Sequence, residues 1–274
     1  MAQPDFQLSG WEVSKQIGKG HAGDVYKCKS DMFPRAAVKV VRLDKFLTIS
    51  RSKARKRMCK EVDIMKSLNH RNIVRPLEVQ QSKKDFALIM TYAKGSSLID
   101  SIPFKGFPEH RVVRIMQQLL NAVHHMHHRN IVHGDLKPDN LIIDVKNHDR
   151  LKVTDFGFSQ QLSETGCALA LGWTACYAPP ECHVQKAPIV NKKYDIWSCG
   201  IIMCMLLSGT FPLTEENFEA MRNNEPVNIE ISLNCSQYAV EALGAMLQVD
   251  CRRRLSAEEI LNLQFFQTPR SFLV

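Results

Sequence analysis

The sequence lacks the features that carry a chain into or across a membrane. Its first ten residues contain no basic stretch followed by an apolar core, so we expect no signal peptide. The most apolar window, residues 196–211, is shorter than a bilayer span and is interrupted by two serines and two glycines. We therefore expect a buried helix in this window.

Internal repeats, low-complexity tracts and paired CxxC motifs are also missing. Nine cysteines, an odd number, favour free thiols in a reducing compartment, so we expect a cytoplasmic protein, with the nucleus as the alternative. The net charge of +8 indicates acidic partners or solubility rather than a fold class. We expect a monomer with neither nucleic acid nor a membrane as partner. A chain of 274 residues holds one large domain or two smaller ones.

One short loop concentrates the residue types that carry chemistry. Residues 131–144 read IVHGDLKPDNLIID and place an acid, Asp135, a cation, Lys137, and an amide, Asn140, between two apolar runs. Such runs predict short buried strands that hold the loop between them.

A second carboxylate, Asp155, follows another apolar segment and precedes Gly157, which permits an unusual backbone bend. Phosphoryl transfer needs a carboxylate that accepts the proton of the attacking hydroxyl, a cation near the transferred group, and oxygen ligands for magnesium. Asp135 suits the first role, Lys137 the second, and Asn140 with Asp155 the third. The sequence therefore predicts a phosphoryl-transfer site.

These motifs resemble those of eukaryotic protein kinases over residues 11–266. The phrases DFGFS at 155–159 and TACYAPPE at 174–181 are similar to the calcium/calmodulin-dependent kinase group. The resemblance implies an α+β, two-lobed fold with an antiparallel-sheet N-lobe that carries one main helix and a larger, mostly helical C-lobe. The expected bounds are 11–91 for the N-lobe, 91–95 for the hinge, 96–266 for the C-lobe, and 1–10 and 267–274 for short tails.

The activity that the resemblance implies is transfer of the γ-phosphate of ATP, with Mg²⁺, to Ser/Thr hydroxyls of protein substrates. Thr174 stands where Ser/Thr-specific members of the family place a hydroxyl that bonds the catalytic acid and the lysine that corresponds to Lys137. This pattern favours Ser/Thr over Tyr as the acceptor residue in the substrate. An external regulatory partner is compatible with it. Two alternatives stay open: a pseudokinase scaffold that binds nucleotide and partners, and a small-molecule kinase of related fold.

The stretch IGKGHAGDV matches the family's glycine-rich GxGxxGxV motif. Glycines let the backbone approach phosphates closely, and the alternating residues that follow predict a strand, so we expect a hairpin lid. By itself the spacing also suits the start of a helix in a dinucleotide-binding fold, or a plain surface turn. The lid residues are Ile17, Gly18, Lys19, Gly20, His21, Ala22, Gly23, Asp24 and Val25.

A lysine inside the next predicted strand, Lys39, needs a partner to stay charged. The helix expected at 53–68 supplies one, because Glu61 lies on the same face as its apolar stripe. The resemblance makes Lys39 and Glu61 the ion pair of an active kinase, with Lys39 as the cation for the α- and β-phosphates. The basic start of this helix is either a solvated face or a docking patch.

Strands are predicted at 73–74 and 86–90, followed by the hinge. By resemblance, Met90 limits the back of the adenine pocket, and Tyr92 and Ala93 contact the purine. The residues expected to sandwich the ring are Ile17, Val25, Ala37 and Ile142.

The family also implies several supporting contacts. His133 should stack with Phe156, Met65 and Leu77 in one column, and the four histidines 124, 125, 127 and 128 make a weak case for zinc because no Cys or carboxylate joins them. Glu181 should pair with Arg254, and Asp195 should anchor the loop between the two apolar runs of residues 131–144, which corresponds to the family's catalytic loop.

Two residues depart from the family pattern: Gly134 stands where Arg is usual, and Trp173 where Gly is usual. The usual Arg pairs with a phosphate on the activation segment, which corresponds to residues 155–181 here. We therefore expect activity that is independent of phosphorylation at Ser163 or Thr165, and a peptide pocket reshaped by Trp173.

Overall fold

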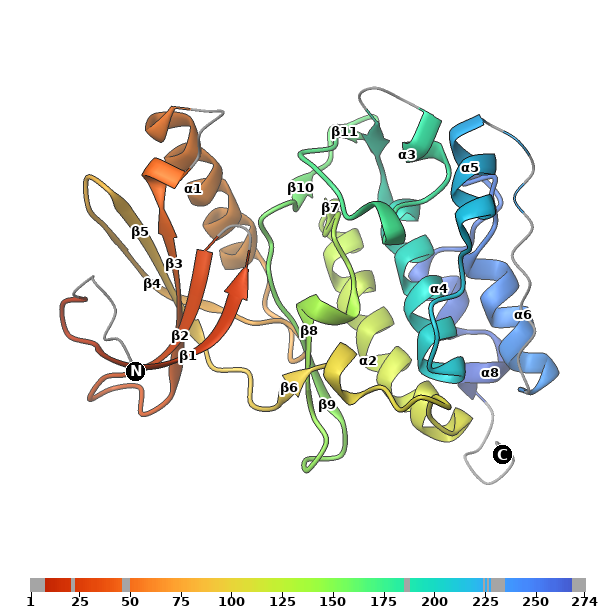
Figure 1. Cartoon of the computed structure of the whole chain (residues 1–274), viewed down its shortest axis with the longest axis horizontal. Helices are drawn as coiled ribbons and strands as arrows, with labels where there is room; N and C mark the ends of the chain where they lie inside the picture. The colour runs from red at the N-terminus through yellow and green to blue at the C-terminus, as the bar shows by residue number, and fades with distance from the viewer. Residues whose placement is uncertain are drawn as a thin grey trace. The chain divides into compact units, whose positions relative to one another are not determined.

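The computed structural model describes residues 8–20, 23–45, 50–184, 188–223, 225, 227 and 235–267. Two compact units are present. We call the first, within residues 1–69 and 73–94, the N-lobe, and the second, within residues 70–72 and 95–274, the C-lobe. Figure 1 colours the chain in sequence order through both units. Two predicted lid residues, His21 and Ala22, lie outside the described residues.

The N-lobe is an antiparallel sheet in the order β1-β2-β3-β5-β4. Its strands are β1 (Glu12–Gly20), β2 (Gly23–Lys29), β3 (Ala36–Arg42), β4 (Pro76–Gln81) and β5 (Asp85–Thr91). The central strands β3 and β5 are almost wholly buried, which their continuous apolar sequence dictates. The single-turn η1 (Leu43–Lys45) follows β3.

Among the described residues of the N-lobe, the long helix is α1 (Arg51–Ser67), which lies beside the sheet in Figure 1. Ser50 caps its start by accepting a hydrogen bond from the backbone N–H of Lys53. Met58, Val62 and Met65 are buried at helical spacing, as the sequence predicts.

The C-lobe is mostly helical. Its helices are α2 (Glu109–His128), α3 (Glu181–Val184), α4 (Lys192–Ser208), α5 (Glu215–Asn223), α6 (Gln237–Met246), α7 (Ala257–Leu261) and α8 (Gln264–Gln267), with single turns η2 (Ile99–Ser101), η3 (Pro138–Asn140) and η4 (Ala175–Tyr177). The helices α2 and α4 run side by side in Figure 1. α4 is buried along nearly its whole length, as predicted for the apolar window. Among the described residues, no helix combines the length and the apolar character that a membrane crossing requires.

Short strand pairs hold the predicted catalytic loop. β7 (Ile131–Val132) precedes the loop and pairs with β10 (Gln160–Gln161), while β8 (Leu141–Asp144) follows it and lies between β6 (Ser96–Ser97) and β9 (Arg150–Val153). A further pair joins β11 (Ala168–Leu169) to β12 (Ile189–Val190). Both ends of the loop are therefore tied to strands, which limits its freedom.

The predicted fold class is confirmed, with one local correction. Residues 73–74 form no strand; Ile73 makes a single bridge, and β4 begins at Pro76. β4 is an edge strand that carries Glu78, Gln80 and Gln81. An edge strand needs little apolar surface, so the polar sequence of β4 does not predict a strand. The apolar pair Ile73–Val74 does predict one, although these two residues are buried for another reason than strand pairing.

Candidate active site

Asp135, Lys137 and Thr174 form a closed triangle of polar contacts in the C-lobe. The Thr174 hydroxyl donates to Asp135 Oδ1 at 2.6 Å, and Lys137 Nζ donates to the Thr174 hydroxyl at 2.7 Å. The third side is the ion pair of Lys137 Nζ with Asp135 Oδ2 at 2.9 Å. The carboxylate of Asp135 is only 4% exposed, while Lys137 is 21% exposed. The cation thus lies at the open side of a buried acid.

Asn140 holds both the backbone and the carboxylate of Asp135 in place. Its Nδ2 donates to the Asp135 backbone carbonyl at 2.8 Å and to Oδ2 at 3.0 Å. Since the amide nitrogen makes both bonds, the carbonyl oxygen Oδ1 is the end of the side chain that suits a cation.

Asp155 directly follows a residue that is hydrogen-bonded to the backbone of Asn140. The preceding residue, Thr154, donates to the Asn140 backbone carbonyl through its N–H at 2.9 Å and its hydroxyl at 3.0 Å. Asp155 itself has a positive φ of 58°, an uncommon conformation outside glycine, and its Oδ1 accepts from the Gly157 N–H at 3.4 Å. One amide oxygen and one carboxylate on adjacent chain segments are hard oxygen donors, which fit Mg²⁺.

No cluster of three or more His, Cys, Asp or Glu that could hold a metal occurs in the part of the chain that the structure describes. The predicted pair fits this finding, because Mg²⁺ in nucleotide sites takes only one or two protein ligands besides phosphates and waters. His124 and His128 have ring centroids 6.4 Å apart.

Asp195 anchors the catalytic loop by binding its backbone. This fully buried carboxylate accepts from the backbone N–H groups of His133 at 2.9 Å and Gly134 at 3.0 Å. Its third partner is the Nε2 of His127, at 2.8 Å. Gly134 adopts a φ of +76°, which glycine reaches without strain. Asp195 therefore holds the backbone immediately before Asp135.

His127 is a supporting residue that the sequence did not single out from the three histidines near it. In the structure His127 is buried and contacts Asp195, while His128 is exposed. The helical period was the available signal, because Val123 and Met126 mark the buried face on which His127 also lies.

His133 and Phe156 are in ring contact, with centroids 5.0 Å apart in an edge-to-face arrangement. The Nε2 of His133 lies 3.1 Å from the backbone carbonyl of Thr154. The catalytic loop and the segment around Asp155 are thus packed together, as predicted for this pair. The proposal that Met65 and Leu77 continue the column stays a prediction.

In the N-lobe, Lys39 and Glu61 form the predicted ion pair. Lys39 Nζ lies 2.8 Å from Glu61 Oε1, with side-chain exposures of 8% and 4%. Both charges are buried, so each stabilises the charged form of the other.

The glycine-rich stretch is the predicted hairpin, since β1 and β2 pair antiparallel and Gly20 lies opposite Gly23. Ile17 is 39% exposed, and Ala37 and Met90 are buried in β3 and β5. Gly18, Lys19, Asp24 and Val25 belong to the hairpin strands, Tyr92 and Ala93 follow β5, and Ile142 belongs to β8 of the C-lobe.

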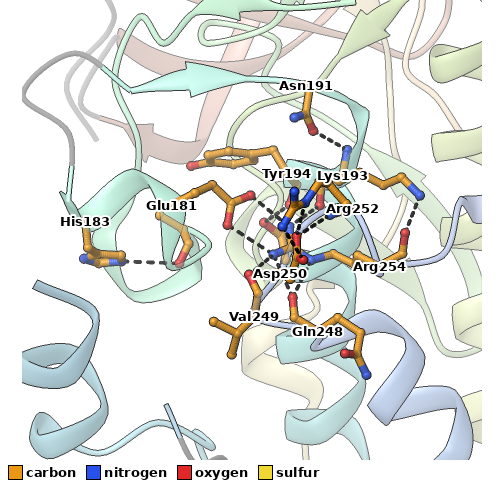
Figure 2. A network of polar contacts seen from close by, with 12 residues as sticks. Glu181, His183, Asn191, Lys193, Tyr194, Gln248, Val249, Asp250, Arg252 and Arg254 are labelled. Carbon is orange, nitrogen blue, oxygen red and sulfur yellow. Dashed lines mark hydrogen bonds and ion pairs between the residues drawn. The ribbon is translucent and has the colours of Figure 1, made fainter. Parts of the chain in front are cut away.

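The end of the activation segment is tied down by the predicted pair of Glu181 with Arg254. Arg254 Nη1 and Nη2 lie 3.0 and 3.1 Å from the two Glu181 carboxylate oxygens. Arg254 is fully buried, and it also donates to the backbone carbonyls of Gln248 and Lys193 (Figure 2). The guanidinium satisfies a carboxylate and several carbonyls at once, a task that suits its planar fork.

Tyr177 lies within the same segment. Burial, reinforced by the charge of Asp139, raises the pKa of the Tyr177 phenol well above its usual value, and the hydroxyl donates to Met205 Sδ at 3.7 Å. Tyr177 also contacts Phe211 edge to face. The bond to Met205 joins the segment to α4, and the ring contact joins it to Phe211 just after that helix.

The model of the protein kinase domain matches residues 11–266 of the chain, which therefore belongs to the protein kinase domain family. The chain is 32% identical over 273 residues to CBL-interacting serine/threonine-protein kinase 5 of Arabidopsis thaliana, a match that covers 96% of this chain and 60% of the relative. It is 35% identical over 272 residues to CBL-interacting protein kinase 11 of Oryza sativa subsp. japonica, covering 96% of this chain and 52% of the relative.

A third relative is the probable serine/threonine-protein kinase HSL1 of Saccharomyces cerevisiae, 32% identical over 210 residues, with 74% of this chain and 13% of the relative covered. The chain spans about half to three fifths of the length of the plant relatives that it matches. The comparisons therefore establish the family, and the activity follows as a proposal.

Proposed function

We propose that the protein is an ATP-dependent protein kinase that transfers the γ-phosphate to Ser/Thr hydroxyls of protein substrates. The observation that carries the proposal is the triangle of Asp135, Thr174 and Lys137. A scaffold has no need of a buried carboxylate with a cation and a hydroxyl bonded to its two oxygens.

The residues act by positioning and by charge. Asp135 orients the acceptor hydroxyl and takes its proton, and the bonds from Asn140 keep the carboxylate aimed. Lys137 stabilises negative charge on the transferred phosphoryl group and its Nζ already lies 2.9 Å from the acid. Lys39, held by Glu61, is assigned to the α- and β-phosphates.

Asn140 Oδ1 and the Asp155 carboxylate are the residues assigned to Mg²⁺, which when bound neutralises charge on the phosphates. The acceptor class follows from Thr174. Its hydroxyl bridges the acid and the lysine at distances of 2.6 and 2.7 Å and belongs to the site of a Ser/Thr kinase. The names of the plant relatives record an interaction with CBL, and we propose an external regulatory partner for this chain too.

The test is transfer from ATP and Mg²⁺ to a Ser/Thr peptide library by the wild type and by Asp135→Asn. The wild type should phosphorylate peptides, and the variant should lose nearly all transfer while it keeps nucleotide binding and melting temperature. No transfer by a folded wild type that binds ATP would favour the pseudokinase scaffold. Gly134 and Trp173, which depart from the family pattern, would then be the residues to revert.

We also propose that activity does not require phosphorylation of the activation segment. Gly134 offers no cation for such a phosphate. The unmodified segment has its own bonds: β10 pairs with β7, β11 pairs with β12, and the Ser163 hydroxyl donates to the Cys167 carbonyl at 2.8 Å. Ser163→Ala combined with Thr165→Ala should retain activity within about twofold. A large loss at unchanged melting temperature would contradict this independence.

A further inference from the structure

We propose that Phe158 is a positioning residue whose ring holds Thr174 in place for phosphoryl transfer. The inference rests on the proposed kinase activity and concerns a residue of the DFGFS phrase to which the sequence assigned no role. The ring lies against Gly172, two residues before Thr174, and the backbone of Phe158 lies against Gly134, one residue before Asp135. Phe158 therefore joins the two chain segments that carry the acid and the hydroxyl.

The contact with Gly172 leaves no room for a side chain. A Cβ placed on Gly172 would overlap Cε1 of Phe158 and lie 3.1 Å from its Cδ1. The φ of Gly172 is +149°, a conformation that other residues rarely adopt. The ring thus occupies the space that any other residue at position 172 would fill.

The contact with Gly134 lies on the backbone side of Phe158. A Cβ on Gly134 would lie 3.0 Å from the Phe158 carbonyl oxygen and 3.9 Å from its Cβ. The N–H of Gly134 is bonded to Asp195, so this surface of the catalytic loop is rigidly placed. Phe158 is consequently packed against a fixed support.

The segment that precedes Thr174 is held by backbone hydrogen bonds but has little apolar packing of its own. Its large apolar side chains face solvent: Leu169 is 66% exposed, Leu171 41% and Trp173 37%. The alternate positions that face inward carry only small residues, Ala168, Ala170 and Gly172, of which the two alanines pack on an apolar cluster. Phe158 supplies the large apolar group that this inward face lacks.

The backbone on either side of Phe158 is held without help from its ring. The Ser159 hydroxyl donates to the His133 carbonyl at 3.0 Å, the Ser159 N–H donates to the Phe156 carbonyl at 3.0 Å, and Gln160 pairs with Val132. Truncating the ring should therefore leave residues 155–161 in place. The expected change is confined to residues 168–178.

The experiment compares wild type, Phe158→Ala, Phe158→Leu and Phe104→Ala by amide hydrogen exchange, thermal melting and peptide kinetics. Phe104 is 85% exposed, so its truncation is a matched control that removes a ring without a packed contact. Phe158→Ala should speed exchange in residues 168–178 and lower kcat/KM for peptide by about tenfold to a hundredfold. The KM for ATP should stay within about twofold, because the nucleotide residues are untouched.

Phe158→Leu should give exchange protection and kcat/KM clearly below those of the wild type and above those of Phe158→Ala, since a leucine fills only part of the space beside Gly172. Phe104→Ala should match the wild type in every readout. If Phe158→Ala fails to fold, the leucine variant decides: exchange and kcat/KM equal to those of the wild type would overturn the proposal.

Two other results would also overturn it. One is a Phe158→Ala variant that equals the wild type in exchange and in kcat/KM. The other is a general loss of protection across α2 and α4, which would assign the ring a merely structural role. If the wild type transfers no phosphate, the proposed function fails, and the exchange data alone then decide whether Phe158 holds the segment.

Discussion

At the scale of single residues, Asp195 has the largest expected influence on the catalytic loop. Its carboxylate accepts three hydrogen bonds, two of them from the backbone just before Asp135. An amide in its place has only one acceptor oxygen. Asp195→Asn should therefore lower kcat by about a hundredfold through misplacement of the loop and lower the free energy of unfolding by about 1–3 kcal/mol. Steady-state kinetics and denaturant titration measure the two effects.

Asp149 provides the control, because it is a buried carboxylate of the same lobe outside the site. It is 5% exposed and pairs with Arg111 at 2.8 Å and Arg114 at 3.1 Å. Asp149→Asn should reduce stability while kcat stays within about twofold. Equal losses of kcat in both variants would show that buried charge, and not the support of the loop, explains the effect.

The two partners of the Arg254–Glu181 pair should contribute unequally to the free energy of unfolding. Arg254→Met strands the Glu181 carboxylate and several backbone carbonyls, and should lower the free energy of unfolding by about 3–5 kcal/mol. Glu181→Gln should cost less, about 1–3 kcal/mol, because Arg254 keeps its carbonyl partners. Urea titrations of both variants give the comparison.

The exposed pair of Arg222 with Glu215 is the matched control for the buried one. Its side chains are 53% and 81% exposed, and its contact distance of 2.9 Å is similar. Arg222→Met should change stability by no more than about 1 kcal/mol. Comparable losses in Arg254→Met and Arg222→Met would contradict the role assigned to burial.

At the scale of elements, the contact of α2 with the segment that links α1 to β4 should depend on pH. His125 of α2 and His70 of the link are in ring contact, with centroids 5.0 Å apart. Arg129 Nη1 lies 3.2 Å from His125 Nδ1, and since arginine only donates, the neutral imidazole accepts there. The buried Nε2 of His125 has no hydrogen-bond partner among the residues that the structure describes. A second proton on this ring would therefore displace Arg129.

Burial, followed by the charges of Arg129, His70, His124 and His128, lowers the pKa of His125 from 6.5 to about 4. Burial, with Lys152 and Arg71, lowers the pKa of His70 as well. The unfolded chain then binds more protons than the folded one below pH 6.5. The stability from these groups is complete above that pH and is lost as the pH falls towards 4.

The melting temperature of the wild type should therefore fall between pH 7 and pH 5, and the fall should be shallower in His125→Phe, which keeps a ring and cannot titrate. His148→Asn serves as the control, since His148 is an exposed residue of the same lobe and is not among the groups that shift His125. The same pH slope in His125→Phe and in the wild type would refute the assignment.

At the scale of the whole molecule, the cysteines should differ widely in reactivity. All nine are free thiols, and only Cys176 is exposed. Burial raises the pKa of the Cys28 thiol to about 11 and the pKa of Cys182 and of Cys204 to about 12. Burial also raises the pKa of Cys199 well above its usual value. Because the thiolate is the reactive form, these four should react only after unfolding.

A thiol-specific reagent should label one cysteine rapidly in the native protein and all nine in denaturant. Cys176→Ser should remove the rapid phase, while Cys199→Ser should leave it unchanged. A rapid phase that survives in Cys176→Ser would place the reactive thiol elsewhere in the chain.

The sequence alone determined the loop chemistry and the main elements. Asp135, Lys137 and Asn140 lie within six residues, so their meeting depends on local geometry that strands on either side enforce. Similarly, the apolar period of α1 determines that Glu61 shares a face with Met58 and Met65. Local spacing suffices in such cases because helical and strand periods are short.

Only the tertiary structure decided which distant side chains meet. His127 looked like its histidine neighbours until the fold brought Asp195 beside it, 68 positions along the chain. Phe158 and Gly172 likewise lie against each other only because separate strand pairs, β10 with β7 and β11 with β12, bring the segment back on itself. Contacts of this kind depend on packing across many residues, and no short periodicity in the sequence encodes them.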